Sequence, residues 1–586
     1  MIFFVNKNLF KYFINMVKLP EEIKYEKAIN LFKKKKYKKC LKILQDLEEN
    51  TNIDLDINAY TLIKNCFKNT SKNNSNKFVI YLRKLTDKYI NDNKKKKYLL
   101  TELAGIDKNN INVQFILGQS YLEHKVYDEA IKQFDKVLFL YKKFPNSLLH
   151  KGTADKCETL MLLACCHMDK SKYRLRWRQD DLKLSRKLLL ESYSIKKTDS
   201  CYCNIVLNYF KNNQLEKALE FAKQNKPEKQ NKQTIITMHS HYSMIYFRMK
   251  LFDIAEIHMK KCMELVENNN RIEFLYGSLL LAKKNFKEGF KWYESRLLHY
   301  KSAYTVLNGI NLDFWNGESC RNLIVCTEQG AGDIIQFSRF FYNVLEKFPD
   351  ITIYYYMTNN FAKKIKFLDH KHDKIKLIND FNDIELDKSK DKKISCLSLP
   401  HKLNLDSIKP YNGVRYIKEN NEHITFWKNK LSKLKKKIKV GLCWVGNYRE
   451  ISVEKKINLH KFKFLSNLNI DIISLQKGLG EEELENIDFK IHKFDIDNEE
   501  MYKDTIAIMR NIDLLICIDT SIAHIAGIMG IKTWLLIGGI SEWRWSTDVG
   551  ENYWYDSIKI IRSKKVDCWD GLLQEVNDKL IEEFQL

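Results

Sequence analysis

Apolar residues along this 586-residue chain follow two different periods, and the change falls near residue 318. Before that point they recur at helical spacing, and only five of the 20 glycines precede residue 300. After it, short apolar runs of strand length alternate with helical patterns. The pattern predicts a helical N-terminal half followed by an α/β half.

Within the helical half, small and bulky residues recur at relative positions 8, 11, 20 and 24 of a repeat, and each copy below is given by its small residue at position 8. One copy begins at Ser243 and the next begins 34 residues later at Gly277. This is the period of tetratricopeptide repeats, in which small residues let two antiparallel helices approach closely. Further copies begin at Ala28, Gly118 and Val206, residues 154–197 resemble a repeat with a long insertion between its helices, and residues 50–110 are too degenerate to assign. We therefore predict tetratricopeptide-like repeats over residues 21–300, because unrelated amphipathic helices would show no such spacing.

Two sets of strands are predicted in the α/β half. They lie at residues 322–327, 351–357, 374–378 and 393–397, and then at 438–444, 470–475, 512–518 and 532–537. A Lys-rich helical stretch at 420–437 separates the two sets. Alternating strands and helices indicate a parallel sheet in each set, and therefore two Rossmann-like halves. Such sheets bind ligands beyond the carboxyl ends of their strands, so those loops are the candidate sites.

Charge narrows the possible ligands. The chain has 99 Lys and Arg against 74 Asp and Glu, so its net charge is 99 − 74 = +25. That charge favours anionic ligands such as nucleoside diphosphates or nucleic acid, although lysines spread over solvated helix faces explain it equally well. The chain has no RNP-like motif and no interleaved aromatic and basic residues, which argues against nucleic acid.

Cysteine usage and hydropathy indicate the compartment. None of the 14 cysteines forms a CxxC pair, which fits a reduced, cytoplasmic protein. No run of about 20 apolar residues predicts a transmembrane span. Residues 1–20 are apolar but interrupted by Asn and Lys, so we expect a poorly ordered N-terminal segment, with Met1 or Met16 as the start.

The first candidate loop follows the strand at residues 322–327. It contains Gln329, Gly330, Gly332 and Asp333, and a helical pattern begins there. A glycine turn at a helix start offers backbone N–H groups to an anion or substrate, with Asp333 as a carboxylate at its mouth. Asp333 could equally cap the helix.

The second candidate loop follows the strand at residues 512–518. It contains Asp519, Thr520 and Ser521, and His524 lies one helical turn further on. Hydroxyl and N–H groups at a helix start could hold a diphosphate against the helix dipole. The alternative is a capped helix with a hydrogen-bonded histidine.

Two further loops offer weaker signals. The strand at 438–444 leads into Trp444, Gly446, Asn447 and Arg449, and Lys456 follows. One of these cations could reach a phosphate, or all could be surface charge. The strand at 470–475 leads to Gln476, whose amide could bind a ribose or a base.

Taken together, the order of these motifs resembles the glycosyltransferase family 9 (heptosyltransferase-like) domain, which follows tetratricopeptide repeats in many bacterial proteins. The resemblance runs from about residue 270 to the C-terminus. It includes Phe286 and Gly289, Tyr293, Glu294 and Arg296, Trp315-Asn316-Gly317, Glu328 to Asp333 with Gln336, Phe337 and Arg339, Ser398-Leu399-Pro400, Trp444 to Asn447, Ser474-Leu475-Gln476, Asp519 to Gly527, Trp543-Arg544-Trp545, and Trp554-Tyr555.

The resemblance implies a GT-B fold with residues 318–419 on the acceptor side and residues 438–586 on the nucleotide-sugar side. It implies an inverting transfer that needs neither a metal nor a cofactor, with a nucleotide-diphosphate sugar as the substrate. Asp333 matches the family's candidate general base, and Gln329, Gly330 and Gly332 lie on the acceptor loop. The donor-binding positions would be Trp444, Gly446, Asn447, Arg449, Lys456, Gln476, Asp519, Thr520, Ser521 and His524.

Two departures and one competing motif stand beside the resemblance. Lys455 and Lys456 replace an Arg-rich stretch, and Ala331 replaces a larger aliphatic residue. Because Lys lacks the bidentate fork of Arg, phosphate binding would be weaker. The triplet at residues 495–497 could instead suggest a metal-dependent DxD transferase, or simply a solvated acidic turn.

The sequence therefore predicts a glycosyltransferase whose repeats present an acceptor, a protein or peptide, to the catalytic domain. The alternative is a non-catalytic repeat scaffold that carries a degenerate transferase domain. Asp333 together with Asp519, Thr520 and His524 favours the enzyme.

Overall fold

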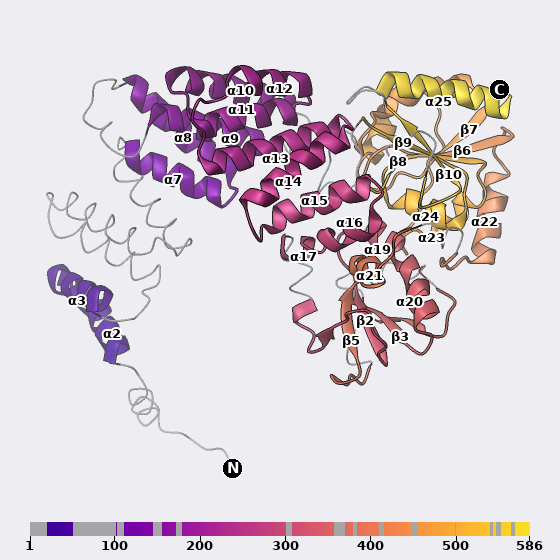
Figure 1. Cartoon of the computed structure of the whole chain (residues 1–586), viewed down its shortest axis with the longest axis horizontal. Helices are drawn as coiled ribbons and strands as arrows, with labels where there is room; N and C mark the ends of the chain where they lie inside the picture. Colours follow the sequence, from indigo (N-terminus) through magenta and orange to yellow (C-terminus); the bar gives the residue numbers. More distant parts are fainter. Residues whose placement is uncertain are drawn as a thin grey trace, which may run out of the picture. The chain divides into compact units, whose positions relative to one another are not determined.

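The computed structural model describes most of the chain in separate stretches (Figure 1). They are residues 20–50, 101, 111–143, 155–170, 178–299, 307–356, 368, 370–378, 384–408, 415–446, 455–498, 500–539, 543–545, 552–563 and 569–585. The chain divides into two compact units, Met1–Asn208 and Tyr209–Leu586. The predicted poorly ordered segment lies outside the described residues, except for Pro20, where a helix begins.

In the described part of the first unit, the helices before α11 (Asp199–Lys211) form pairs. They are α2 (Pro20–Lys33) with α3 (Tyr37–Asn50), α7 (Ile111–Glu123) with α8 (Tyr127–Lys143), and α9 (Lys156–Lys170) with α10 (Arg178–Ile195). The small residue Gly118 permits close packing, because a Cβ there would lie 2.7 Å from the ring of Phe134. The insertion predicted within residues 154–197 falls on residues 171–177, outside the described part.

Helix α11 (Asp199–Lys211) leads into the second unit, which begins with more helices. They are α12 (Leu215–Gln224), α13 (Lys232–Arg248), α14 (Phe252–Leu265), α15 (Asn270–Ala282), α16 (Phe286–Tyr293) and α17 (Arg296–His299). A Cβ on Gly277 would collide with the backbone of Tyr293, and one on Gly289 would lie 2.8 Å from Leu281. Both glycines are therefore required by the approach of α15 to α16.

The turn inside each repeat has the same geometry throughout. Seven residues after the small residue, the backbone turns left-handed, with φ between 54° and 66°. These positions are Lys35, Lys125, Asn213, Lys250 and Lys284. The next N–H then reaches back five residues at 2.9 Å, from residues 36, 126, 214, 251 and 285 to the carbonyls of Leu31, Tyr121, Tyr209, Tyr246 and Leu280. This closure, a Schellman-type helix ending, confirms the predicted repeat spacing.

Two parallel sheets follow the repeats, each with five strands among the described residues. The first has the order β1-β5-β2-β3-β4 and consists of β1 (Asp313–Phe314), β2 (Asn322–Cys326), β3 (Thr352–Tyr356), β4 (Ile375–Ile378) and β5 (Lys392–Ser395). The second has the order β10-β9-β8-β6-β7 and consists of β6 (Ile438–Cys443), β7 (Ile470–Ser474), β8 (Leu514–Ile518), β9 (Thr533–Ile537) and β10 (Ile558–Arg562). Two Rossmann-like halves therefore follow the repeats, as predicted. Strands β1 and β10 were not predicted.

Helices between the strands cover the sheets. In the first half they include α19 (Ala331–Phe337), the 3₁₀ helix η3 (Ser338–Phe340), α20 (Phe341–Lys347), η6 (Cys396–Ser398) and α21 (Leu399–Lys402). The second half has α22 (Asn421–Leu431), η10 (Leu459–Asn467), η11 (Glu481–Asn486), α23 (Lys503–Met509), α24 (Ser521–Met529) and α25 (Trp569–Phe584). Every residue of β2, β7, β8 and β9 is buried, as expected of parallel strands covered on both faces.

One hydrophobic core joins the last repeat to both halves. It contains Phe290 of α16, Phe337 of α19 and Ile525 of α24, with Trp543 and Trp554 packed among them. The last repeat is therefore part of the same packed body as the two sheets. Among the described residues, no helix combines the length and the apolar character that a membrane crossing requires.

Candidate active site

The two strand-end loops predicted to carry the chemistry meet in the structure. The first-half loop, residues 327–330, joins β2 to α19, and the second-half loop, residues 519–520, joins β8 to α24. A Cβ on Gly332 would lie 2.9 Å from Cδ2 of His524 and 3.8 Å from Cα of Ser521. The missing side chain at Gly332 therefore lets the first turns of α19 and α24 come into contact.

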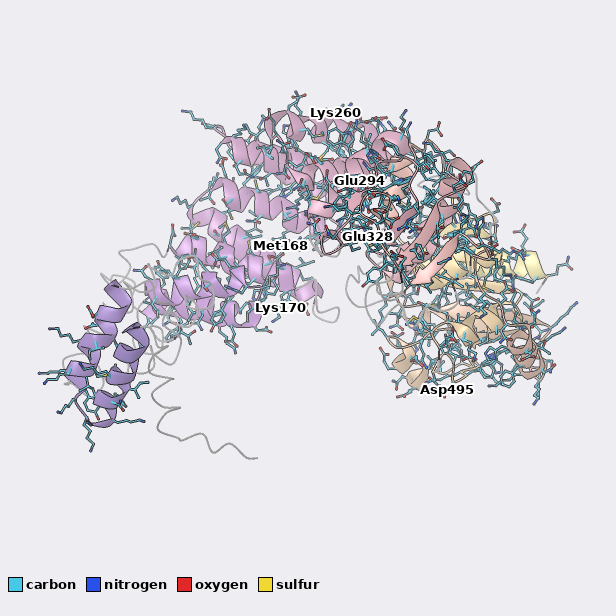
Figure 2. The ribbon with its side chains drawn as sticks, turned by 90° about the horizontal axis from the view of Figure 1, so that it is seen from below. Met168, Lys170, Lys260, Glu294, Glu328 and Asp495 are labelled. Carbon is cyan, nitrogen blue, oxygen red and sulfur yellow. The ribbon has the colours of Figure 1, made fainter. Side chains whose placement is uncertain are left out.

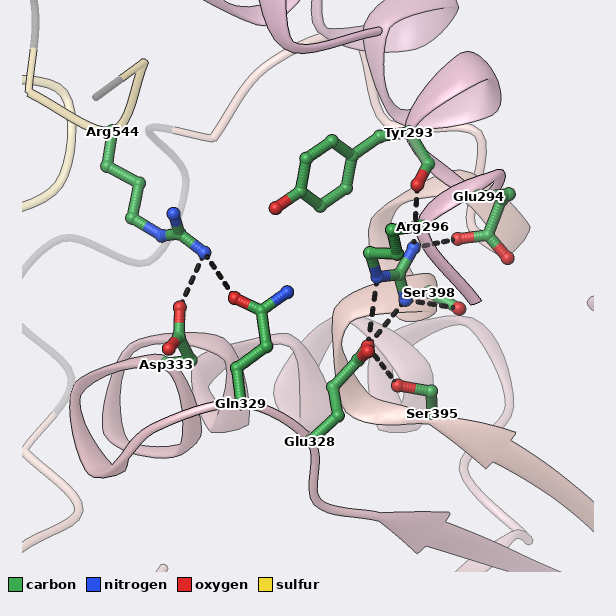
Figure 3. Close-up of polar contacts among 9 residues, drawn as sticks. All are labelled: Tyr293, Glu294, Arg296, Glu328, Gln329, Asp333, Ser395, Ser398 and Arg544. Carbon is green, nitrogen blue, oxygen red and sulfur yellow. Dashed lines mark hydrogen bonds and ion pairs between the residues drawn. The ribbon is translucent and has the colours of Figure 1, made fainter. Parts of the chain in front are cut away.

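Asp333 is held on both of its carboxylate oxygens. It is the third residue of α19, and its Oδ2 accepts a hydrogen bond of 3.0 Å from the N–H of Gly330. Its Oδ1 lies 2.5 Å from Nη2 of Arg544, which also donates to Oε1 of Gln329 at 3.4 Å (Figure 3). Asp333 thus reaches back to the residue at the cap position, Gly330, rather than occupying that position itself. The Asp333 side chain stays 19% exposed, so a substrate can reach it.

A buried ion pair fixes the start of the first-half loop to the last repeat. Arg296 of α17 donates from Nε at 3.0 Å and from Nη2 at 2.6 Å to Oε1 of Glu328. The same guanidinium bonds Glu294 at 2.6 Å and Ser398 at 2.8 Å, and Ser395 donates to Glu328 (Figure 3). Figure 2 shows Glu294 and Glu328 near each other at this junction.

The charges in this cluster stabilise one another. Burial alone would lower the pKa of Arg296, but the carboxylates of Glu328 and Glu294 raise it well above its ordinary value. Arg296 therefore stays charged, although its side chain is only 1% exposed. Because a buried cation needs its partners, the residue just before Gln329 is held by the repeat.

Neutral contacts, by contrast, hold the first turn of α24. The hydroxyl of Tyr502 lies 2.5 Å from Oγ of Ser521, and Nδ1 of His524 lies 2.9 Å from the hydroxyl of Tyr555. The His524 ring stacks on Trp545 with centroids 5.2 Å apart. Burial raises the pKa of Tyr502 to about 12 and also raises that of Tyr555, so both hydroxyls stay neutral at physiological pH.

A carboxylate at the start of this turn is neutralised. Asp519 directly follows β8, and its Oδ2 lies 3.0 Å from Nζ of Lys455. An unpaired carboxylate there would repel an anion approaching the N–H groups of α24. The ion pair with Lys455 removes that repulsion.

The third and fourth predicted loops are built around Gln476. Its Oε1 accepts from the N–H groups of Trp444 at 3.0 Å and Val445 at 2.9 Å. Its Nε2 donates to the carbonyls of Val445 at 2.9 Å and Leu479 at 2.6 Å. The amide therefore holds the loop after β6, and a Cβ on Gly446 in that loop would lie 3.5 Å from Cγ2 of Thr520.

Of the cations predicted in and after this loop, the structure describes Lys456. Nζ of Lys456 lies 2.6 Å from Oε1 of Glu483. Asn447 and Arg449 lie outside the described residues. The structure therefore brings Gly446 beside Thr520 and pairs Lys456 within the second half.

Residues 543–545 contact three parts of the second unit, a role that sequence reasoning did not assign. Trp543 packs on Tyr293 of the last repeat at a centroid distance of 5.7 Å. Arg544 binds Asp333 of the first half, and Trp545 stacks on His524 of the second half. The Trp-Arg-Trp motif was the available signal, since a cation between two large aromatic residues is typical of a buried contact.

The acidic triplet at residues 495–497 is used structurally. Oδ1 of Asp497 accepts from the N–H of Asp504 at 2.7 Å, and Oδ2 accepts from the hydroxyl of Thr505 at 2.5 Å. Asp497 therefore caps the start of α23, whereas Asp495 is exposed and lies apart from Glu328 (Figure 2). This arrangement fits the acidic turn. No group of three or more metal-binding side chains occurs within the described stretches.

Comparisons with known proteins yield weak likenesses. No family model matches the chain. It is 22% identical over 348 residues to protein FlbA of Caulobacter vibrioides, a match covering 52% of this chain, and it spans only about half (54%) of that relative's length.

Similar solved structures correspond to the two kinds of architecture. A glycosyl transferase of family 9 from Veillonella parvula is 12% identical, with a TM-score of 0.33, over 47% of this chain and 99% of the other. A tetratricopeptide repeat protein from Parabacteroides merdae is 13% identical, with a TM-score of 0.25, over 44% of this chain and 97% of the other. The fold rests on the repeat turns and the two parallel sheets described above.

Proposed function

We propose that the chain is a glycosyltransferase that moves a sugar from a nucleotide-sugar to an acceptor hydroxyl. The observation that carries this proposal is the contact between the first turns of α19 and α24 at Gly332 and His524. The contact brings the helix turn that carries Asp333 up to the first turn of a helix from the other half. The two groups are those that this transfer needs, a proton acceptor and an anion site.

In the proposed reaction, the acceptor oxygen attacks the anomeric carbon on the face opposite the leaving group, and its proton passes to Asp333. The bond from the anomeric carbon to the diphosphate breaks, and the electron pair leaves with the diphosphate. N–H groups at the start of α24, with the hydroxyls of Thr520 and Ser521, would meet the charge that develops there. Neutralisation of Asp519 by Lys455 supports this assignment.

The remaining predicted residues would shape the donor side. Gln476 holds the backbone of Trp444 and Val445, and Gly446 borders Thr520. We assign Gln476 to positioning this loop, and we retain Asn447, Arg449 and Lys456 as proposed donor contacts. No metal or cofactor takes part in the proposed mechanism.

The repeats would deliver the acceptor, for which we propose a protein or peptide in the cytoplasm. The buried Arg296–Glu328 pair supports this role, because it ties the last repeat to the loop that carries Gln329. An acceptor bound by the repeats would thus be held at a fixed position relative to Asp333.

A non-catalytic scaffold is the second candidate, and one observation favours it. Arg544 occupies the carboxylate that the reaction requires. A domain that had lost its activity could keep such an ion pair permanently.

Ligand binding separates the two candidates. The full chain should be heated with a panel of nucleotide-sugars, and one of them should raise its unfolding temperature. A donor at 100 times its Kd adds about 2.7 kcal/mol of stability. Transfer from that donor should continue in EDTA. If no nucleotide-sugar stabilises the chain, the scaffold is the better description.

A further inference from the structure

We propose that Arg544 holds Asp333 while the donor site is empty and moves to the donor's diphosphate when the donor binds. Donor binding would then free the base, and the donor would bind before the acceptor. This inference rests on the proposed function and adds a residue that the sequence left without a role.

The contact between Arg544 and Asp333 is short and largely shielded from solvent. Arg544 and Asp333 are 8% and 19% exposed, and their closest atoms lie 2.5 Å apart. Charge-assisted hydrogen bonds of this kind are about twice as strong as neutral ones, and they are not weakened by bulk water when buried. In this contact Arg544 occupies Oδ1 of Asp333, and the N–H of Gly330 occupies Oδ2. The resting arrangement therefore disfavours proton transfer to Asp333.

The position of Arg544 relative to α24 also matters. The neighbour of Asp333, Gly332, touches His524 and approaches Ser521. Trp545, the residue after Arg544, stacks on His524, so the segment that carries Arg544 lies against the first turn of α24, where the anion would bind. Trp543 and Trp545 are 8% and 1% exposed and hold the backbone on either side of Arg544. The long side chain can change partner while its backbone stays in place.

The carboxylate of Asp333 and the diphosphate of the donor can both bind the Arg544 guanidinium. A guanidinium presents a planar fork of donors that fits a phosphate as well as a carboxylate. A diphosphate carries more negative charge than Asp333, and that charge increases as the sugar leaves. With Arg544 on the diphosphate, the leaving group is stabilised and Asp333 can accept the acceptor's proton in the same step.

The test is a double-mutant cycle read by binding rather than by activity. Calorimetry on the full chain would measure the Kd values of ADP, CDP, GDP, UDP and inorganic pyrophosphate. Arg544→Gln should raise the Kd of the nucleoside diphosphate that binds best by about 10- to 100-fold. This is the range for the loss of one charged hydrogen-bonding group. Asp333→Asn should lower the Kd of the same ligand several-fold, because the ligand no longer competes with a carboxylate for Arg544. That gain should vanish in the Arg544→Gln background.

Two further variants control for folding and charge. Arg510→Gln breaks another Arg–carboxylate pair, between Arg510 of the second half and Glu419, and should leave the Kd unchanged. Arg544→Lys keeps the charge but loses the fork, so its Kd should lie between those of the wild type and Arg544→Gln. The helical content and the unfolding temperature of each variant are measured first. Kd values are compared only among variants whose helical content equals that of the wild type.

The outcomes are distinguishable. Unchanged or weaker binding by Asp333→Asn would overturn the exchange of Arg544 between partners while leaving the transferase proposal intact. Unchanged binding by Arg544→Gln would overturn it as well. If the wild-type chain binds none of the nucleoside diphosphates, the proposed function itself fails and the exchange fails with it.

Discussion

The first-half and second-half loops each follow the central strand of their sheet and begin a helix, yet different contacts hold them. Ion pairs hold the first, through Arg296 with Glu328 and Arg544 with Asp333. Tyrosine hydroxyls and ring stacking hold the first turn of α24, through Tyr502 and Tyr555, and one ion pair, Lys455 with Asp519, lies at its start. An incoming anion competes more strongly for the cation of an ion pair than for a neutral hydroxyl. The comparison therefore assigns change to the contact of Arg544 with Asp333 and rigidity to the tyrosine contacts of α24.

The largest effect should come from breaking the buried ion pair of the first loop. Arg296→Met leaves Glu328 buried without its cation, and we expect the free energy of unfolding to fall by about 3–5 kcal/mol. Urea unfolding would measure it. Lys392→Met, which breaks the exposed pair with Asp313, should cost about 1 kcal/mol or less. Equal losses in the two variants would show that burial of the pair does not matter.

The next effect concerns chemistry rather than stability. Asp333→Asn keeps the size of the side chain but removes its capacity to accept a proton, so sugar transfer should fall by about 100-fold or more. Donor affinity should not fall. Steady-state kinetics with saturating donor would measure the loss. Wild-type transfer rates would exclude Asp333 from proton transfer.

Acid should weaken the support of the first loop. His370 stacks on Tyr416 at 4.7 Å, and the Tyr416 hydroxyl donates to the carbonyl of Ile335 in α19. Burial, followed by the nearby His372, lowers the pKa of His370 to about 3. The unfolded chain therefore takes up a proton first as pH falls below about 6.5, and this contribution to stability is lost progressively down to about pH 3.

The expected change in the free energy of unfolding follows from its slope against pH. Each pH unit below 6.5 should cost about 1.4 kcal/mol at this site, or about 2 kcal/mol at pH 5. Urea unfolding between pH 7 and pH 5 would measure it. His370→Phe should remove this part of the slope. An unchanged slope would mean that His370 takes up its proton in the folded state as well.

The smallest effect should come from the second loop. Tyr502→Phe removes the hydrogen bond to Ser521 and should lower the free energy of unfolding by about 1 kcal/mol. Because neither group is charged, this loss should be the same in 50 mM and 500 mM salt. A loss that shrinks in high salt would contradict the division between charged and neutral supports.

The sequence predicts those features that depend on local periodicity. The repeat spacing at Ser243 and Gly277, and strands of five or six residues such as β6 and β8, all follow from patterns within one element. Strand β1 spans only Asp313–Phe314 and has no period of its own. Its place in the sheet comes from pairing with β5, which is distant in the chain.

The candidate site could be predicted only in part, for the same reason. Asp333 and Ser521 were found because each follows a strand and begins a helix. Arg544 lies 211 residues from Asp333, and Arg296 lies 32 residues from Glu328. No periodic pattern encodes such pairings. The amide of Gln476 was predicted to contact the donor; in the structure it makes four hydrogen bonds to backbone groups of Trp444, Val445 and Leu479.

The core shared by the last repeat and both halves limits how such a chain can be recombined. A genetic crossover placed after α17 would separate Phe290 from Phe337 and Trp543, leaving an apolar face on each product. A recombinant that keeps the two sheets must therefore keep α15 to α17 with them.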